Sequence, residues 1–214
     1  MSYFPFFIDL EGKKCLVVGG GEVACRKVEA LLPFGIHVFM KAQDYCEELK
    51  TLEKQEACEG RLKLIYGTFD KEDLKDVFFV IAATDNEELN RVISIECRNR
   101  GILVNAVDQK ELCSFYFPSL VKKEDLVVGI SSGGNSPGLA KKIRKKVEAE
   151  IPDYYAPLNR QLGIVREQVL ENISKETVRK KCFEEIIAFG EKEKRELTQE
   201  EMESIFKKFF DKKS

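Results

Sequence analysis

Short hydrophobic runs alternate with amphipathic segments over the first half of the chain. Strand-like runs, apolar or alternating, occupy residues 14–18, 37–40, 63–66, 77–83 and 102–107. Helical spacing fills the intervals at residues 22–32, 45–59 and 87–100. The run at 77–83 is apolar throughout, which is typical of a strand covered on both faces of a sheet. The alternation therefore predicts an α/β domain with a parallel sheet over residues 1–112.

The alternation stops after residue 112. Two β-rich runs, residues 114–121 and 126–131, flank the polar turn 122–125 and predict a hairpin. A glycine- and serine-rich loop then leads into a basic helix predicted over residues 137–150, with Ser136 as its N-cap. A two-stranded hairpin is marginally stable alone. We therefore expect residues 113–150 to form a dimerisation region in a homodimer.

The pattern from residue 151 onward is helical only. Apolar residues recur at i, i+4, i+7 and i+11 from Leu158 to Val169. Thr198 and Glu201 have the spacing of a capping box at the start of a last helix. Residues 151–214 are therefore predicted to form a C-terminal all-helical domain.

Composition narrows the function class. The 35 Lys and Arg residues against 37 Asp and Glu leave a net charge of -2, which argues against nucleic acid or an anionic membrane as partner. No run approaches the ~20 apolar residues of a spanning helix, and the first residues do not resemble a signal peptide. The seven cysteines form no C-x-x-C pair, and His37 is the only histidine. We expect reduced thiols in a cytoplasmic protein, a structural His37 and no metal site.

A glycine-rich turn carries the strongest chemical signal. Gly19, Gly21 and Ala24 fit G-x-G-x-x-G/A directly between a predicted strand and a predicted helix. The first glycine permits a tight turn, the second lets the backbone approach a pyrophosphate, and the small third residue lets the helix pack on the strand. The pattern predicts a Rossmann-like nucleotide-binding domain, with a glycine turn that binds no ligand as the alternative.

Further cofactor contacts are expected where other strands end. Asp44 lies 20 residues past Ala24, where a ribose-binding acid belongs, and Gln43 stands beside it. A helix N-cap, paired with Glu47, is an equally good role for Asp44. Lys41 leaves room for a 2′-phosphate, although NAD is favoured over NADP. Thr84, at the end of the fourth strand, either contacts the cofactor or caps the next helix.

Asp108 follows the fifth predicted strand in the same crevice. A carboxylate that emerges from an apolar run is costly unless it is paired, solvated or used. We expect it to be half-buried and to serve as an acid–base group. A plain turn aspartate is the alternative.

The loop at residues 131–136 is a candidate anion site. Its glycines leave backbone N–H groups for an anion, and the helix that follows carries basic residues, Lys141 among them. A polycarboxylate substrate fits this combination. A capped helix after a turn, with a solvated basic face, is the alternative.

An opening segment and four later motifs resemble those of a known family. Residues 3–27, 82–86, 104–108, 114–119 and 131–137 occur in the order found in the N-terminal module of sirohaem synthases. Members of this family are precorrin-2 dehydrogenases, and some are also sirohydrochlorin ferrochelatases. The resemblance covers residues 1 to about 150 closely and the tail only in its helical character.

The resemblance implies NAD-dependent oxidation of precorrin-2 to sirohydrochlorin by a homodimer. It implies that Asp108 is catalytic and that Glu22-Val23 and Gln43-Asp44 contact NAD. It places Ser132 in the substrate region, at a serine that some members phosphorylate. Iron chelation, with Fe²⁺ as substrate, is left open because the family includes dehydrogenase-only members. The substrate carries eight carboxylates, for which the expected contacts are Ser132, Asn135, Ser136 and Lys141.

Two other functions compete with the dehydrogenase. One is another NAD(P)-dependent oxidoreductase of small molecules on the same fold. The other is a non-catalytic nucleotide-sensing module whose helical tail recruits a partner. The sensing module needs neither Asp108 nor the loop at residues 131–136, so the dehydrogenase is favoured.

Overall fold

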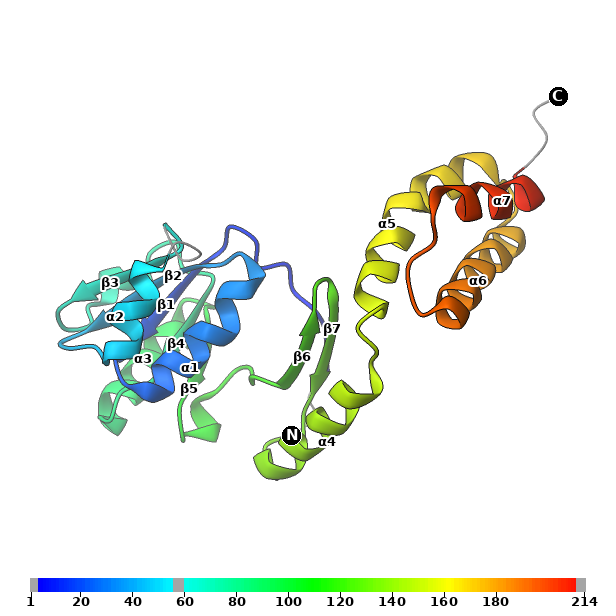
Figure 1. Ribbon diagram of the computed structural model, residues 1–214. Coiled ribbons are helices and arrows are strands. Elements are labelled where there is room, and N and C mark those ends of the chain that lie inside the picture. The colour runs from blue at the N-terminus through cyan, green and yellow to red at the C-terminus, as the bar shows by residue number, and fades with distance from the viewer. Residues whose placement is uncertain (1–3, 56–59, 211–214) are drawn as a thin grey trace. The chain divides into compact units, whose positions relative to one another are not determined.

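The computed structural model describes residues 4–55 and 60–210, and the chain divides into two compact units, residues 1–117 and 118–214 (Figure 1). The first unit holds a five-stranded parallel sheet of order β3-β2-β1-β4-β5. Its strands are β1 (Lys14–Val18), β2 (His37–Ala42), β3 (Leu62–Tyr66), β4 (Phe79–Ala82) and β5 (Leu103–Ala106). Its helices are α1 (Glu22–Leu31), α2 (Glu47–Lys54) and α3 (Glu87–Asn99), with short 3₁₀ turns at Leu32–Phe34, Lys71–Leu74 and Lys110–Leu112. This confirms the predicted Rossmann-like sheet.

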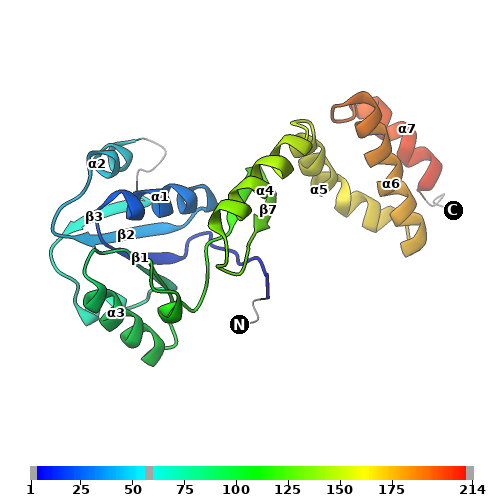
Figure 2. The same ribbon diagram turned by 90° about the horizontal axis from the view of Figure 1, so that it is seen from below.

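Helices cover both faces of the sheet, with α1 and α2 on one side and α3 on the other (Figure 2). Successive side chains of β1 alternate accordingly: Cys15 and Val17 pack in one cluster, Leu16 and Val18 in the other. Every residue of β4 is buried, as expected for a central strand. Burying a large apolar side chain contributes about 1.5–3 kcal/mol, so these two clusters are the main source of stability of this unit.

The predicted strand at residues 114–121 starts too early. Strand β6 runs from Ser119 to Lys123 and pairs with β7 (Leu126–Ile130). The aromatic residues before it pack instead: the ring centroids of Phe115 and Phe79 lie 5.3 Å apart, and those of Phe115 and Phe117 lie 5.6 Å apart with the rings tilted. Their β propensity reflects burial against the sheet rather than strand pairing.

The predicted helix at residues 45–59 also starts too early, and residues 56–59 of it lie outside the described residues. Helix α2 begins at Glu47, with Cys46 as N-cap. Tyr45 is buried, and its hydroxyl lies 2.7 Å from the Ile65 carbonyl and accepts from the Ile65 N–H at 3.1 Å. These bonds hold residue 45 in the core and delay the helix.

The second unit begins with the β6–β7 hairpin and α4 (Pro137–Glu150), for which Ser136 is the N-cap as predicted. Three helices follow, α5 (Tyr155–Asn172), α6 (Glu176–Glu193) and α7 (Gln199–Phe209), around their own apolar core. Leu158, Val165 and Val169 are buried in that core, which confirms the predicted spacing. The capping box of Thr198 and Glu201 is present at α7.

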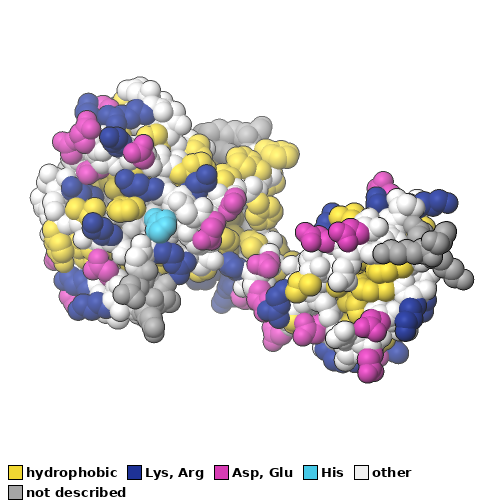
Figure 3. Space-filling model, turned by 90° about the horizontal axis from the view of Figure 1, so that it is seen from above, with side chains coloured by type: hydrophobic (Ala, Val, Ile, Leu, Met, Phe, Trp, Pro, Cys, Tyr) yellow, Lys and Arg dark blue, Asp and Glu magenta, His cyan; other side chains and the backbone are white. Residues whose placement is uncertain are grey.

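Surface charge is mixed rather than gathered by sign. On the face shown in Figure 3, Lys and Arg side chains lie among Asp and Glu side chains, in keeping with the net charge of -2. Across residues 4–55 and 60–210, no helix combines the length and the apolar character that a membrane span requires.

Candidate functional site

The carboxyl edge of the parallel sheet gathers the predicted site residues of the first unit. The strand order reverses at β1, which lies between β2 and β4, and open α/β sheets bind ligands at such a reversal. Gly19 directly follows β1, Thr84 follows the end of β4, and Asp108 follows the end of β5. This edge is therefore the candidate site for a nucleotide and for chemistry.

Two glycines of the turn after β1 are required by packing. Gly19 has a φ of +123°, and a Cβ there would lie 2.2 Å from the Ala83 carbonyl oxygen. A Cβ on Gly20 would lie 1.9 Å from the Asp44 carbonyl oxygen. The Gly20 carbonyl in turn accepts from the Cys46 N–H at 2.8 Å. These contacts join the glycine turn to the end of β4 and to the segment that follows β2.

Gly21 differs, because a Cβ there would meet no atom within 4 Å. It is the N-cap of α1, with ordinary extended backbone and no side chain to cap the helix. Gly21, Glu22 and Val23 are all exposed, so the first N–H groups of α1 face open space. Such a start attracts anions through its N–H groups and the helix dipole. The protein itself does not need a glycine here, whereas a closely approaching pyrophosphate does.

Gln43 and Asp44 lie exposed just beyond β2. The Asp44 carboxylate accepts from the Tyr45 N–H at 2.8 Å and lies 3.5 Å from Lys50 Nζ. The Tyr45 N–H, followed by Lys50, lowers the pKa of Asp44, so the carboxylate is ionised at neutral pH. Asp44 is not the helix cap proposed for it, because its oxygen is bound to the adjacent N–H and α2 begins after Cys46. Its side chain is 83% exposed and free to accept from ribose hydroxyls.

Lys41 is poorly placed to receive a 2′-phosphate. Its Nζ lies 3.4 Å from Asp73 Oδ1, and both side chains are largely buried. The sequence leaves Lys41 open as a 2′-phosphate contact, and this stays untested. The pairing with Asp73 disfavours it, because a phosphate would have to displace a largely buried ion pair.

Thr84 turns inward at the end of β4. Its hydroxyl donates to Asn90 Oδ1 at 2.7 Å, and the buried Asn90 amide returns a bond to the Thr84 carbonyl at 2.9 Å. Asn86, not Thr84, caps α3 by accepting from the Leu89 N–H at 3.0 Å. A contact between Thr84 and the cofactor stays a prediction, and it would use the backbone or methyl group.

Asp108 occupies a tight turn beyond β5. Its φ of +59° lies in the left-handed region, which aspartate tolerates better than most residues. The Cys113 thiol closes this turn, accepting from the Ala106 N–H at 3.3 Å and donating to the Ala106 carbonyl at 3.1 Å. Asp108 is exposed rather than half-buried as expected, because it lies in the turn and not on the strand. No described residue forms a hydrogen bond or ion pair with its carboxylate, which is therefore available to a substrate.

Lys27 of α1 is a further charged group at this edge, and the sequence analysis did not select it. Its Nζ lies over the Phe117 ring, 4.2 Å from the centroid. Burial lowers the pKa of Lys27, while nearby Cys113 and Asp108 act in the opposite direction. The available signal was a lysine on the apolar face of a helix, which usually indicates only a packed aliphatic stem.

Gln109 is a second residue that the sequence did not distinguish. Its Nε2 donates to the Glu87 carbonyl at 3.2 Å, which ties the Asp108 turn to the start of α3. Its Oε1 is buried and has no hydrogen-bond partner in the described residues.

The predicted substrate residues lie in the second unit: Ser132, Asn135 and Ser136 are in the loop before α4, and Lys141 is on α4 itself. Ser132 Oγ accepts from the Ser136 N–H at 3.0 Å, and the Asn135 N–H donates to the Ser132 carbonyl at 3.2 Å. The Gly133 N–H donates to Ser131 Oγ at 3.1 Å. The loop thus satisfies several N–H groups that we expected to remain open to an anion, because its own serines compete for them. Asn135 and Lys141 are exposed.

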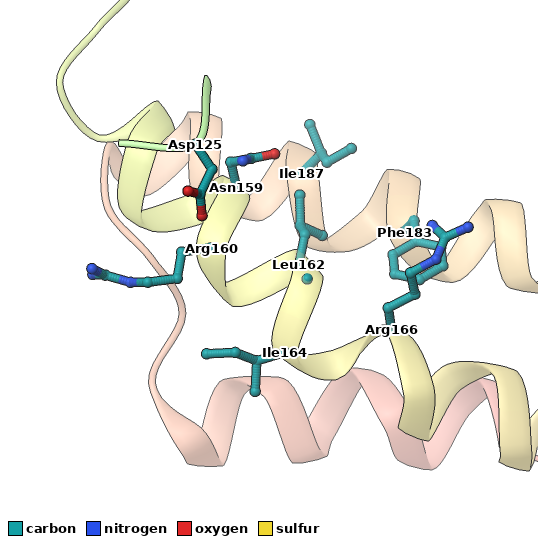
Figure 4. A pocket seen from close by; sticks show the side chains of 9 residues that line it. Asp125, Asn159, Arg160, Leu162, Ile164, Arg166, Phe183 and Ile187 are labelled. Carbon is teal, nitrogen blue, oxygen red and sulfur yellow. The ribbon is translucent and has the colours of Figure 1, made fainter. Parts of the chain in front are cut away.

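A groove in the second unit is lined by other residues. It measures about 780 Å³ and opens beside α5 and α6 (Figure 4). It is lined by Asp125, Asn159, Arg160, Leu162, Gly163, Ile164, Arg166, Phe183 and Ile187. This mixture of apolar and oppositely charged side chains does not form a constellation for acid–base or redox chemistry.

The sequence predicts a structural role for His37. His37 Nδ1 lies 3.2 Å from the Gly60 carbonyl oxygen, which suits a structural histidine. Within residues 4–55 and 60–210, no three His, Cys, Asp or Glu side chains come together in a way that could hold a metal ion.

Two family models match the chain. The model described as "Putative NAD(P)-binding" matches residues 6–119, and "Sirohaem biosynthesis protein central" matches residues 124–150. The first match covers the sheet and the Asp108 turn. The second covers all of β7 and α4 and the loop at residues 131–136 between them.

Curated relatives and a solved structure agree with these models. The chain is 40% identical over 187 residues to "Siroheme synthase" of Nitrosospira multiformis and 40% identical over 185 residues to that of Photorhabdus laumondii. These matches cover 87% and 86% of this chain but 40% and 38% of the relatives, so the chain spans about two fifths of their length. The solved structure "SirC, precorrin-2 dehydrogenase" has the same fold, with a TM-score of 0.78, 23% identity and coverage of 97% of this chain and 98% of that one.

Proposed function

Because the chain belongs to the NAD(P)-binding family whose model matches residues 6–119, we propose that it is an NAD-dependent dehydrogenase that oxidises precorrin-2 to sirohydrochlorin. The names of the relatives, siroheme synthase and precorrin-2 dehydrogenase, support the substrate. The observation that carries the proposal is the open space at Gly21. It lies at the start of α1, on the same sheet edge as the Asp108 carboxylate, which has no partner among the described residues.

The first unit supplies a cofactor site suited to NAD. We assign the pyrophosphate to the N–H groups from Gly21 to Val23, and the ribose hydroxyls to Asp44 with Gln43 beside it. An ionised Asp44 would repel a 2′-phosphate, and Lys41 is held by Asp73. Both features favour NAD over NADP.

The reaction removes a hydride and a proton from a reduced tetrapyrrole. When bound, NAD supplies the hydride acceptor. Asp108 receives the proton at a carboxylate oxygen, and its exposed position leaves that oxygen accessible. A positioned general base is typically worth about 10²–10⁴-fold in rate.

The second unit is proposed to hold the substrate's carboxylates. Ser132, Asn135, Ser136 and Lys141 are the assigned contacts, with Lys142 and Arg144 beside them. Because the loop at residues 131–136 satisfies several of its own N–H groups, we assign the binding to side chains and to the positive charge of α4.

The six cysteines that the structure describes are free, which suits the proposed cytoplasmic location.

We also propose a homodimer. In the first unit Phe4, Phe6 and Phe7 are 83%, 68% and 76% exposed, a degree of aromatic exposure that marks an interaction surface. In the second unit, α4 exposes Leu139 and Ile143, one helical turn apart. The hairpin beside α4 has only two strands, and a two-stranded hairpin alone is marginally stable. We therefore expect a second copy of the chain to pack against it.

The test is NADH formation when enzymatically prepared precorrin-2 is added to the protein and NAD without oxygen. We expect stoichiometric NADH and sirohydrochlorin. NAD binding without oxidation of precorrin-2 would favour another oxidoreductase or the nucleotide-sensing module. Absence of NAD binding by calorimetry would contradict the cofactor site itself.

Iron insertion is proposed as a second activity on the strength of the same carboxylate. Chelation requires a group to accept the pyrrole protons, and the Asp108 carboxylate has no partner in the described residues. Sirohydrochlorin and Fe²⁺ or Co²⁺ are mixed anaerobically with the protein, and metal insertion is monitored by the change in absorbance. We expect insertion faster than the uncatalysed rate and its loss in Asp108→Ala. If wild-type protein inserts the metal no faster than the uncatalysed reaction, the protein is a dehydrogenase only.

A further inference from the structure

The starting point is the environment of Lys27, a lysine that neither the cofactor site nor the acid–base step uses. Lys27 lies in the second turn of α1 and is half-buried. Its ammonium rests on the face of Phe117, with the centroid 4.2 Å away. Within residues 4–55 and 60–210, no hydrogen bond or ion pair engages this ammonium. It is a partly desolvated cation held by a ring alone.

Such a cation is costly unless an acceptor completes its surroundings. Removing an ammonium from water disfavours its charged form, and burial accordingly lowers the pKa of Lys27. An aromatic face compensates in part. Neither Asp108 nor any other described carboxylate comes within ion-pair distance of Lys27 Nζ. The three N–H donors of the ammonium therefore lack an acceptor in the part of the chain that the structure describes.

The neighbours of Lys27 place it at the reaction edge. The charged groups that act on it are Asp108 and Arg26, together with the thiol of Cys113. Cys113 is the residue that closes the Asp108 turn through Ala106. Lys27 and Asp108 are thus close enough to influence one another, but neither satisfies the other.

We propose that Lys27 binds a carboxylate of the substrate and thereby orients the macrocycle against Asp108. The ligand class is a polycarboxylate, because an incoming carboxylate offers the acceptor that the ammonium lacks. The identity of that ligand as a tetrapyrrole rests on the proposed function. Lys27 is then a substrate-binding residue of the first unit, distinct from the loop at residues 131–136.

The test compares Lys27→Met, Lys27→Arg and the control Arg26→Met. Methionine keeps an unbranched stem to pack on Phe117 and removes the charge, whereas arginine keeps the charge. Arg26 is the adjacent exposed cation of the same helix, so its loss changes net charge equally. Circular dichroism and NAD calorimetry check that each variant folds and retains the cofactor site.

The expected kinetic result is a binding defect. Lys27→Met should raise KM for precorrin-2 about 10- to 100-fold, the range for a charged hydrogen bond, with kcat changed far less. The KM of Lys27→Arg should stay within a few-fold of the wild-type value, and so should the KM of Arg26→Met. An unchanged KM in folded Lys27→Met would overturn the proposal. So would a fall in kcat alone with a displaced pH profile, because Lys27 would then act on the ionisation of Asp108.

Equilibrium binding separates this inference from the proposed function. The octacarboxylate uroporphyrin is titrated against each variant, with fluorescence as the readout, whether or not precorrin-2 is oxidised. We expect weaker binding by Lys27→Met than by Arg26→Met at the same ionic strength. Equal affinities, or no binding to wild-type protein, would refute the role of Lys27. Wild-type protein that binds uroporphyrin but forms no NADH would refute the dehydrogenase and leave this contact intact.

Discussion

The three glycines after β1 look alike in the sequence but have different neighbours. Gly19 and Gly20 each have a carbonyl oxygen where a Cβ would stand, whereas Gly21 has open space. A substitution at Gly19 or Gly20 therefore tests packing, and a substitution at Gly21 tests ligand binding. This distinction makes Gly21 the informative position.

Gly21→Asp should fold normally and lose NAD affinity. The added carboxylate meets no protein atom but stands against the pyrophosphate, and juxtaposed like charges cost several kcal/mol, or at least ~100-fold in affinity. Calorimetric titration with NAD measures the loss. Gly138→Asp, at another glycine with open space around it, is the matched control. Undiminished affinity in a folded Gly21→Asp protein would mean that NAD does not use this site.

Asp108→Asn should lower dehydrogenase turnover at least ~10²-fold with little change in NAD affinity. The amide keeps the shape of the side chain and removes the proton acceptor. Asp85→Asn, an exposed carboxylate after β4, should leave turnover unchanged. Near-normal turnover in Asp108→Asn would show that the aspartate serves the left-handed turn and not the chemistry.

Among the elements, α7 shows how a local sequence signal sets a boundary. Thr198 Oγ1 accepts from the Glu201 N–H at 3.3 Å, and Glu201 returns a bond to the Thr198 N–H at 2.8 Å. Thr198→Ala removes the cap, which is worth about 1 kcal/mol, so α7 amides should exchange about fivefold faster. Thr177→Ala, at an exposed threonine of α6, is the control. Unchanged exchange would mean that packing alone sets the start of α7.

The same cap predicts a pH response. Arg195, then the Thr198 N–H, lower the pKa of Glu201 to about 2. A carboxyl with a depressed folded pKa stabilises the fold fully above its unfolded value of about 4.3 and loses that contribution as the pH falls towards 2. An NMR titration of the Glu201 carboxyl should therefore show a midpoint near 2. Arg195→Gln should move that midpoint upward, and Arg166→Gln should not. A midpoint near 4.3 in wild-type protein would contradict the assigned pairing.

Most of the elements were predictable because their signals are local. The apolar run at β4 predicted a strand buried on both faces, and Ser136-Pro137 predicted the first turn of α4. The errors arose where tertiary contacts override local preference. Tyr45 is held in the core by its hydroxyl, which delays α2, and Phe115 packs on Phe79 rather than extending β6.

The candidate site was predictable as a set of positions but not as an environment. Gly21, Asp44 and Asp108 follow from strand order and spacing. The exposure of Asp108 and the pairing of Lys41 with Asp73 depend on turn geometry and on a residue far along the chain. Lys27 was overlooked because its partners, Phe117 and the Asp108 turn, are about 80–90 residues away in sequence.

For the whole molecule, we expect a homodimer at micromolar concentration. The double variant Leu139→Glu with Ile143→Glu should shift it towards monomer, because charge would be buried at the proposed interface. Multi-angle light scattering gives the mass directly. Lys145→Glu, on another side of α4, reverses a charge without touching those apolar positions and should remain dimeric. A monomeric wild-type protein across the micromolar range would contradict the assembly.

The contact between Gly20 and Asp44 has a consequence for how cofactor preference can evolve. The carbonyl of Asp44 is what lies against Gly20, while its carboxylate points into solvent. In the proposed cofactor site one residue thus has two roles: its backbone supports the glycine turn, and its side chain is the assigned contact that distinguishes ribose from phosphorylated ribose. Substitution of Asp44 can change which ribose the site prefers without altering the contact of its backbone carbonyl with Gly20. Cofactor preference can therefore change at residue 44 at the expense of the Tyr45 and Lys50 contacts of its carboxylate, while the glycine turn stays in place.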